Sequence, residues 1–219
     1  MKIGIIGAGY VGRSLAGACV KAGHEVMISN SRGPHTLFTE CGIIGCTAGT
    51  IEEAATFGEI VVVAITMKHY KATPVQALDG KVVIDTNNYY PSRDDAFAEL
   101  DNRSTTSSEL LALHLPGSKI VKAFNAIRMP HFDRDGQPSG SFDRRALPMA
   151  GDDAASKDVV AGLHDTFGYD VVDVGPLSEG WRFEPGMPVY CIRLNRNWLT
   201  RALGEAVRQL TEGQSDGQS

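Results

Sequence analysis

The 219-residue sequence lacks several features that would place it in a particular class of protein. Its formal net charge is -5, and no cluster of Lys and Arg gives it the basic surface of a nucleic-acid-binding protein. No apolar run approaches the roughly 20 residues that a transmembrane helix requires. We therefore expect a soluble protein that has neither nucleic acid nor a membrane as a partner.

Cysteine and histidine are too few and too scattered for a metal site. The four cysteines stand at positions 19, 41, 46 and 191, and no two of them form a Cys-x-x-Cys pair. The six histidines show no metal-ligand spacing. We expect no bound metal, and we expect reduced thiols in a cytoplasmic protein.

Common catalytic motifs are also missing. No Tyr-x-x-x-Lys pair and no Gly-x-Ser-x-Gly elbow is present. The run Ser104 to Ser108 (STTSS) could hold a nucleophile, but a helix cap is the simpler interpretation. The chain after Val174 is too short for the large helical domain that completes the site of hydroxyacid dehydrogenases. The catalytic residues are left unassigned.

The first residues, MKIGIIGAGYVGRSLAGAC, allow two interpretations. A Lys, an apolar run and small residues ending at Cys19 are compatible with an export signal. However, glycines interrupt the apolar run and Arg13 places a charge within it. A buried strand over Ile3 to Ile6, a glycine turn and a helix over Arg13 to Lys21 fit better.

Strand-like and helix-like runs then alternate along the chain. The further strands are expected at Glu25–Ser29, Ile43–Cys46, Ile60–Thr66, Lys81–Asp85 and Lys119–Phe124. Thr50 with Glu53, and Thr106 with Glu109, form capping-box patterns that begin helices. The alternation predicts an α/β fold, a Rossmann-type doubly wound and mostly parallel sheet in the order 3-2-1-4-5-6.

The pattern changes after the sixth strand. Met129 to Arg145 is polar and aperiodic, which predicts a long mobile loop beside the functional pocket. A strand at Ala146–Ala150, a helix at Ala154–Phe167 and a strand at Val171–Val174 extend the sheet, and a C-terminal helix spans Asn197–Leu210. We expect a dinucleotide-binding domain over 1–175, a segment over 176–210 that covers the acceptor pocket, and a disordered tail over 211–219.

The glycine turn carries the first functional prediction. Gly7, Gly9 and Gly12 have Gly-x-Gly-x-x-Gly spacing between a strand and a helix. In that motif the glycines permit the tight turn, the close approach of a pyrophosphate, and close helix–strand packing. We expect the whole stretch to bind a dinucleotide: Gly7, Ala8, Gly9, Tyr10, Val11 and Gly12.

The end of the second strand indicates which dinucleotide is bound. An NAD-binding protein usually has Asp or Glu about 20 residues beyond the glycines. Here Asn30, Ser31 and Arg32 occupy that place, and an arginine fork suits a 2′-phosphate. The sequence therefore predicts NADP.

Polar residues also follow three other strands. They are Thr66–His69, Asp85–Asn88 and Asn125–Arg128, and each group could line a nicotinamide pocket. Because Asn, Asp and Thr are common turn formers, a capping role is equally open for each. The aromatics Trp181, Phe183 and Tyr190 lie in a segment expected to fold over the strand ends and cover a planar ring.

Several of these stretches together resemble NADP oxidoreductases of the deazaflavin (coenzyme F420) dependent type. They are KIGIIGAGYVG, SNSRG, VIDTNN, KAFNAI, LPMAGDD and DVGPL. Archaeal members carry Gly-Gly-Thr-Gly-x-x-Gly at the first turn and His-Thr-Ile-Pro where this chain has Asn125 to Arg128.

The resemblance implies reversible hydride transfer between NADP and a deazaflavin or flavin-type small molecule. It places the pyrophosphate on Gly7, Gly9 and Gly12, and the 2′-phosphate on Ser31 and Arg32. It places Thr66 and Asn125 near the two rings.

Two alternatives stay open. The first is an NADPH-dependent reductase of a small carbonyl, imine, quinone or ferric substrate, and the second is a sensor that binds NADP without turnover. A homodimer is one alternative for the oligomeric state.

Overall fold

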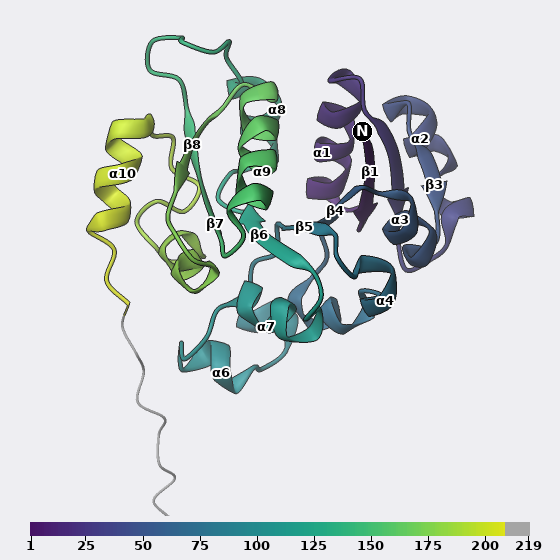
Figure 1. The fold of residues 1–219 in the computed structure, drawn as a ribbon, viewed down its shortest axis with the longest axis horizontal. Coiled ribbons are helices and arrows are strands. Elements are labelled where there is room, and N and C mark those ends of the chain that lie inside the picture. The colour runs from purple at the N-terminus through teal and green to yellow at the C-terminus, as the bar shows by residue number, and fades with distance from the viewer. Residues whose placement is uncertain (209–219) are drawn as a thin grey trace, which may run out of the picture.

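The computed structural model describes residues 1–208. Figure 1 shows a single twisted sheet with helices on both faces. The strands are β1 Lys2–Ile6, β2 Glu25–Ser29, β3 Thr47–Gly49, β4 Ile60–Val63, β5 Val82–Asp85, β6 Lys119–Ala123, β7 Ala146–Gly151 and β8 Asp170–Asp173. The sheet order is β3-β2-β1-β4-β5-β6-β7-β8, so the predicted order of the first six strands is confirmed.

All neighbouring strands are parallel except β6 and β7, which pair antiparallel from Val121 with Gly151 to Ala123 with Met149. The predicted strand–helix–strand extension is therefore present as β7, α9 and β8. In this unit β8 runs parallel to β7, and α9 connects them, as helices connect the parallel strands of the first half.

The helices connect these strands and cover the sheet. They are α1 Tyr10–Lys21, α2 Phe38–Ile44, α3 Ile51–Phe57, α4 Val75–Leu78, α5 Pro91–Asp94, α6 Ala98–Asp101, α7 Ser107–His114, α8 Met129–Asp135, α9 Ala154–Thr166 and α10 Arg196–Gly204. Three 3-10 helices are η1 Pro34–Leu37, η2 Met67–Ala72 and η3 Leu177–Phe183. Both predicted capping boxes exist, at Thr50 and at Thr106.

Successive side chains of the central strands point to opposite faces of the sheet, so the core has two layers. Ile3 and Ile5 pack with α1, α2, α8 and α9, whereas Ile6 packs with α3, α4, α6 and α7. A third cluster joins Phe183, Val189 and Leu199 from η3, the following segment and α10 to β7. In Figure 1 the α2–β3 edge and the β8–α10 edge lie at opposite ends of the molecule.

Two predicted elements are wrong. Ile43 and Ile44 end helix α2 instead of forming the third strand, which is the shorter segment Thr47–Gly49. Ile43 is 80% exposed, and Gly45 ends the helix with a left-handed φ of 82°. The apolar pair was therefore mistaken for a buried strand.

The supposed loop after Arg128 is the second error, because residues Met129–Asp135 form helix α8. Pro130 stands in its first turn, and Met129 and Phe132 bury one face in the core. The C-terminal helix is also shorter than expected and ends at Gly204, a poor helix former. The predicted tail at 211–219 lies outside the described residues.

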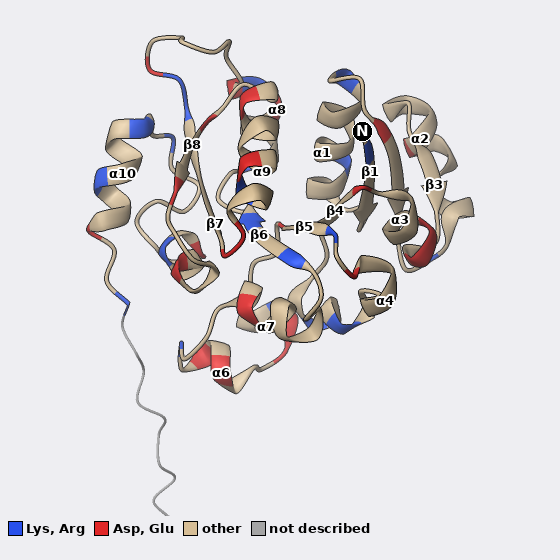
Figure 2. Cartoon of the chain, in the orientation of Figure 1, with Lys and Arg blue, Asp and Glu red and all other residues tan. Residues whose placement is uncertain are grey.

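Charged side chains are distributed over both halves of the fold. In the view of Figure 2, acidic and basic residues are interspersed on the helices and loops, without a face of one sign. No helix among residues 1–208 is both long enough and apolar enough to cross a membrane.

Candidate dinucleotide and acceptor site

The glycine turn joins β1 to α1 at the centre of the sheet. Gly7 has φ +113°, and a Cβ there would lie 2.1 Å from the carbonyl oxygen of Ala64. A Cβ on Gly12 would lie 1.9 Å from the carbonyl oxygen of Gly7. A Cβ on Gly9 would meet nothing within 4 Å. The protein itself requires Gly7 and Gly12, whereas the surface of Gly9 is open to a ligand.

Helix α1 begins without a capping side chain. The first helical hydrogen bond runs from the Arg13 N–H to the Gly9 carbonyl at 3.0 Å, so the N–H groups of Tyr10, Val11 and Gly12 precede the helical ladder. No acidic residue occupies the first turn. This end of α1 can therefore accept the negative charge of a pyrophosphate.

The loop after β2 is ordered by Asn30. Its Oδ1 accepts the Arg32 N–H at 2.9 Å, and its Nδ2 donates to Thr36 Oγ1 at 2.9 Å. Ser31 and Arg32 are exposed, and the Arg32 guanidinium makes no hydrogen bond or ion pair with any described residue. The structure thus presents a fixed backbone with a free guanidinium, which fits a 2′-phosphate.

A pocket of about 630 Å³ lies at the carboxyl ends of β1, β4, β5 and β6. This volume is within the range of roughly 300–1,000 Å³ typical of ligand sites. The predicted residues in its lining are Gly9, Tyr10, Val11, Thr66 and Asn125. Gly7, Ala8, Gly12 and the Asn30–Arg32 loop are outside the lining.

Asn125 and Asn88 form the polar floor of this pocket. Asn125 Nδ2 donates to Asn88 Oδ1 at 3.0 Å and to the Phe183 carbonyl at 3.1 Å. Asn88 Nδ2 donates to the Asn125 carbonyl at 3.0 Å. Asn125 Oδ1 is buried without a partner among the described groups, so a bound ligand with an N–H donor would satisfy it.

Tyr190 reaches the same floor from the C-terminal segment. Its hydroxyl accepts from Asn88 Nδ2 at 3.2 Å and shares a short hydrogen bond with the Tyr90 hydroxyl. Burial raises the pKa of Tyr190, and the hydrogen bond shared with Tyr90 raises it further. Tyr190 is thus neutral over the ordinary pH range and can donate or accept one hydrogen bond.

The other two predicted aromatics lie elsewhere. Phe183 is fully buried in the cluster beneath β7 and contributes only its carbonyl to the pocket floor. Trp181 lines a separate cavity of about 370 Å³ together with Tyr89 and Tyr90. Of the three, only Tyr190 lines the strand-end pocket.

A buried ionic cluster lies directly behind the pocket. The Lys122 ammonium donates to the Asn87 carbonyl at 3.1 Å and to Ser107 Oγ at 2.9 Å. It also lies 3.3 Å from Glu184 Oε1 and 3.9 Å from Asp85 Oδ2. Burial raises the pKa of Asp85, against the opposing effects of Lys122 and of the hydrogen bond from Ser108. The cluster joins β5, β6 and α7 to the segment that carries Tyr190.

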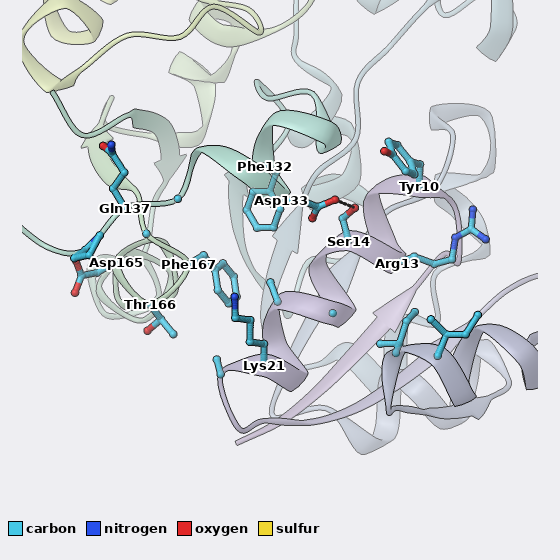
Figure 3. A pocket seen from close by; sticks show the side chains of 18 of the residues that line it. Tyr10, Arg13, Ser14, Lys21, Phe132, Asp133, Gln137, Asp165, Thr166 and Phe167 are labelled. Carbon is cyan, nitrogen blue, oxygen red and sulfur yellow. Dashed lines mark hydrogen bonds between the residues drawn. The ribbon is translucent and has the colours of Figure 1, made fainter. Parts of the chain in front are cut away.

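A larger groove of about 790 Å³ lies outside the strand ends. Figure 3 shows it between α1, which contributes Arg13, Ser14 and Lys21, and the facing residues of α8 and the end of α9. Ser14 Oγ and Asp133 Oδ2 bridge the two sides at 3.4 Å. Of the predicted site residues only Tyr10 borders it, whereas five of them line the strand-end pocket.

Sequence reasoning missed part of the lining. Tyr90, Arg93 and Cys191 line the pocket without having been expected there, whereas Met67 to His69 were expected and do not line it. Met129, from the segment expected beside the pocket, does line it. Tyr90 follows almost directly on the polar end of β5, which could have drawn attention to it. Cys191 approaches only because its N–H donates to the Ala126 carbonyl at 3.2 Å across the fold. No cluster of three His, Cys, Asp or Glu residues within 1–208 could hold a metal.

Comparison with known proteins shows which proteins the chain resembles. Residues 2–89 match the family described as NADP oxidoreductase, coenzyme F420-dependent. This N-terminal part of the chain is therefore similar to that family of NADP oxidoreductases. The matched part contains the glycine turn, the Asn30–Arg32 loop and Thr66, whereas Asn125 and Tyr190 lie beyond it.

Curated relatives extend the comparison. The metalloreductase STEAP3 of Rattus norvegicus is 30% identical over 209 residues, which are 92% of this chain and 38% of the rat protein. The putative protein YjhV of Escherichia coli is 39% identical over 70 residues, which are 32% of this chain and 51% of that protein. The chain thus spans about two fifths of the length of the rat relative and about half of the length of the Escherichia coli relative.

Solved structures share the fold. A hypothetical protein, SMa0349 of Sinorhizobium meliloti, has a TM-score of 0.77 at 27% identity, over 90% of this chain and 95% of that one. A "putative f420 dependent nadp-reductase" from Arthrobacter sp. FB24 has a TM-score of 0.71 at 27% identity, over 82% of this chain and 87% of that one. The 3-hydroxyisobutyrate dehydrogenase of Mycobacterium tuberculosis, with TM-score 0.58 and 15% identity over 80% of this chain and 54% of that one, shows the fold alone.

Proposed function

We propose that this oxidoreductase transfers a hydride between NADP(H) and a deazaflavin (coenzyme F420) or flavin-type acceptor. The observation that carries the proposal is the strand-end pocket, which continues from the first turn of α1 past Asn125 to Tyr190. One end of it suits a nicotinamide dinucleotide, and the other leaves space for a second ring. When bound, NADP(H) supplies the hydride, and the protein has to hold the two rings together.

Each predicted cofactor residue has a role in this proposal. Gly7, Ala8, Gly9 and the N–H groups of Tyr10, Val11 and Gly12 hold the pyrophosphate. Asn30 fixes the loop from which Ser31 and Arg32 hold the 2′-phosphate. Thr66 and Asn125 border the rings, and the unpartnered Asn125 Oδ1 accepts an N–H of one of them.

The pocket lining fits transfer between two cofactors. Among its described residues there is no Asp, Glu, His or Lys, so the only acid–base side chains of that lining are its tyrosines and Cys191. Hydride transfer between two planar rings depends on their apposition more than on such a group. Residues 176–208, including Tyr190, form the segment that covers the acceptor.

One observation favours a second acceptor class. The Tyr190 hydroxyl, paired with Tyr90, lies in the pocket and could donate a hydrogen bond to a small carbonyl or imine substrate. The name of the rat relative adds metal reduction as a further class.

The four cysteines form no disulfide, which is compatible with a reducing compartment such as the cytoplasm.

The test is an acceptor panel. The purified protein is incubated with NADPH and, separately, with coenzyme F420, FMN, a quinone, a ferric chelate and a small aldehyde, and NADPH absorbance is followed. We expect consumption with F420 or FMN. Consumption with the aldehyde or the ferric chelate alone would move the assignment to the second class, and no consumption with any acceptor would leave a protein that only binds NADP.

A further inference from the structure

Arg128 is the uncompensated charge of the strand-end pocket. Two arginines line the pocket, and no carboxylate does so among the described residues. Arg93 is already neutralised, because its Nη2 lies 2.6 Å from Oδ2 of the buried Asp94 and it stacks on the Tyr90 ring at 4.7 Å. Arg128 is exposed, and its guanidinium has no hydrogen bond or ion pair with any described residue.

The backbone holds Arg128 in place although its side chain is free. Its carbonyl accepts the N–H groups of His131 at 2.9 Å and Phe132 at 3.0 Å. Its neighbours Ile127 and Met129 are 5% and 3% exposed, and both line the pocket. The backbone of Arg128 is therefore already ordered at the rim of the pocket. When its guanidinium binds a ligand, only the side chain loses conformational entropy.

The position of Arg128 points to the acceptor side of the pocket. Its charge lowers the pKa of Cys191, against the larger raising effect of burial, so it lies within electrostatic reach of the C-terminal segment.

We propose that Arg128 binds a phosphate group carried by the acceptor, and that it selects a phosphorylated ring over the same ring without phosphate. This inference rests on the proposed function. A guanidinium fork matches two phosphate oxygens. In a pocket without a competing carboxylate its charge is fully available to an anion. The pyrophosphate of NADP has the same chemistry, and the experiment separates the two sources.

FMN and riboflavin make a matched pair for this test, since they share one ring system and differ by a phosphate. Each is titrated by fluorescence quenching into the protein saturated with NADP. The variants are Arg128→Gln and, as control, Arg134→Gln, whose side chain belongs to helix α8 directly after Arg128, is 70% exposed and lies outside the pocket. NADPH affinity is measured for all three proteins by calorimetry.

We expect the wild type to bind FMN more tightly than riboflavin by roughly 10- to 150-fold, the range of one charged hydrogen bond. In Arg128→Gln the FMN affinity should fall to about that of riboflavin, while riboflavin and NADPH affinities stay unchanged. Arg134→Gln should bind all three ligands as the wild type does.

Equal binding of both flavins to the wild type would overturn the inference while leaving the proposed function intact. A loss of NADPH affinity in Arg128→Gln would also overturn it, since the residue would then bind the pyrophosphate of the dinucleotide. If neither flavin binds, the titration is repeated with coenzyme F420 and its unphosphorylated chromophore, judged by the same criteria. Failure of both ring pairs to bind would overturn the proposed function and the inference with it.

Discussion

The proposed phosphate-binding end of the cleft and its proposed acceptor end are built in different ways. The first comes from two short continuous stretches, Gly7–Gly12 and Asn30–Arg32, each directly after a strand. The second brings together Asn88, Asn125 and Tyr190, which are up to 102 positions apart and joined by side-chain hydrogen bonds. A site made from local turns survives changes elsewhere, whereas an assembled site depends on the packing that holds its parts.

The largest expected effect is at the anchor of the acceptor end. Lys122→Met leaves Asp85 and Glu184 without their cation, and breaking such a buried pair costs about 3–5 kcal/mol of unfolding free energy. Lys119→Met is the matched control on the same strand, since its side chain is 50% exposed. Urea unfolding of both variants gives the comparison. Equal stability of the two would mean that the cluster does not hold the acceptor end.

A pH effect of similar size is expected behind Phe124, which lines the pocket. His164 stacks on Phe124 with 4.0 Å between ring centroids, and burial lowers the pKa of His164 from 6.5 to about 4. The unfolded chain therefore binds a proton at a higher pH than the folded one. The free energy of unfolding keeps its full value above pH 6.5. It decreases by about 3 kcal/mol in total as the pH falls from 6.5 to about 4.

Unfolding of the wild type and of His164→Phe, measured over this range, tests that prediction. The variant keeps a ring against Phe124 but cannot titrate, so its stability should lack this acid-induced decrease. The same slope in both proteins would assign the decrease to other groups.

The phosphate-binding end should respond in ligand selectivity instead of stability. Arg32→Ala removes a charged hydrogen bond worth roughly 1.5–3 kcal/mol, so NADPH affinity should fall about 10- to 150-fold. NADH lacks the 2′-phosphate and should bind both proteins equally. Because the contact is electrostatic, added salt should weaken wild-type NADPH binding more than NADH binding. Calorimetric titration of both cofactors measures this, and an equal loss for both would place the 2′-phosphate elsewhere.

The smallest effects are expected from alanine substitutions at two glycines, Gly9 and Gly17, that both have open space around them. Gly9→Ala and Gly17→Ala each add a Cβ that meets nothing within 4 Å. Gly17 lies inside α1, so alanine should raise stability by about 0.5–1 kcal/mol and leave NADPH binding unchanged. Gly9→Ala should leave stability unchanged and weaken NADPH binding, because only the ligand occupies that space. Thermal unfolding and NADPH titration together test this, and unchanged binding in Gly9→Ala would contradict the assigned pyrophosphate site.

Local sequence signals predicted most of the fold. The order of the first six strands follows from apolar runs alternating with helices, and the cap patterns at Thr50 and Thr106 place two helix starts correctly. The prediction failed where a short segment had an ambiguous pattern. Ile43 is apolar yet 80% exposed, and helix α8 buries only Met129 and Phe132 within seven residues.

The sequence by itself determined the glycine turn to which we assign the dinucleotide in our proposal, because most of its backbone geometry depends on residues a few positions apart. Gly7 takes a positive φ, and Gly12 packs against the Gly7 carbonyl five positions before it. Only the tertiary structure decided the acceptor end. Tyr190 rather than Trp181 or Phe183 reaches the pocket, since Asn88 and Tyr90 hold its hydroxyl there and Lys122 holds Glu184 six residues before it. Such contacts form between distant parts of the chain once the sheet has brought the strand ends together, so no local pattern encodes them.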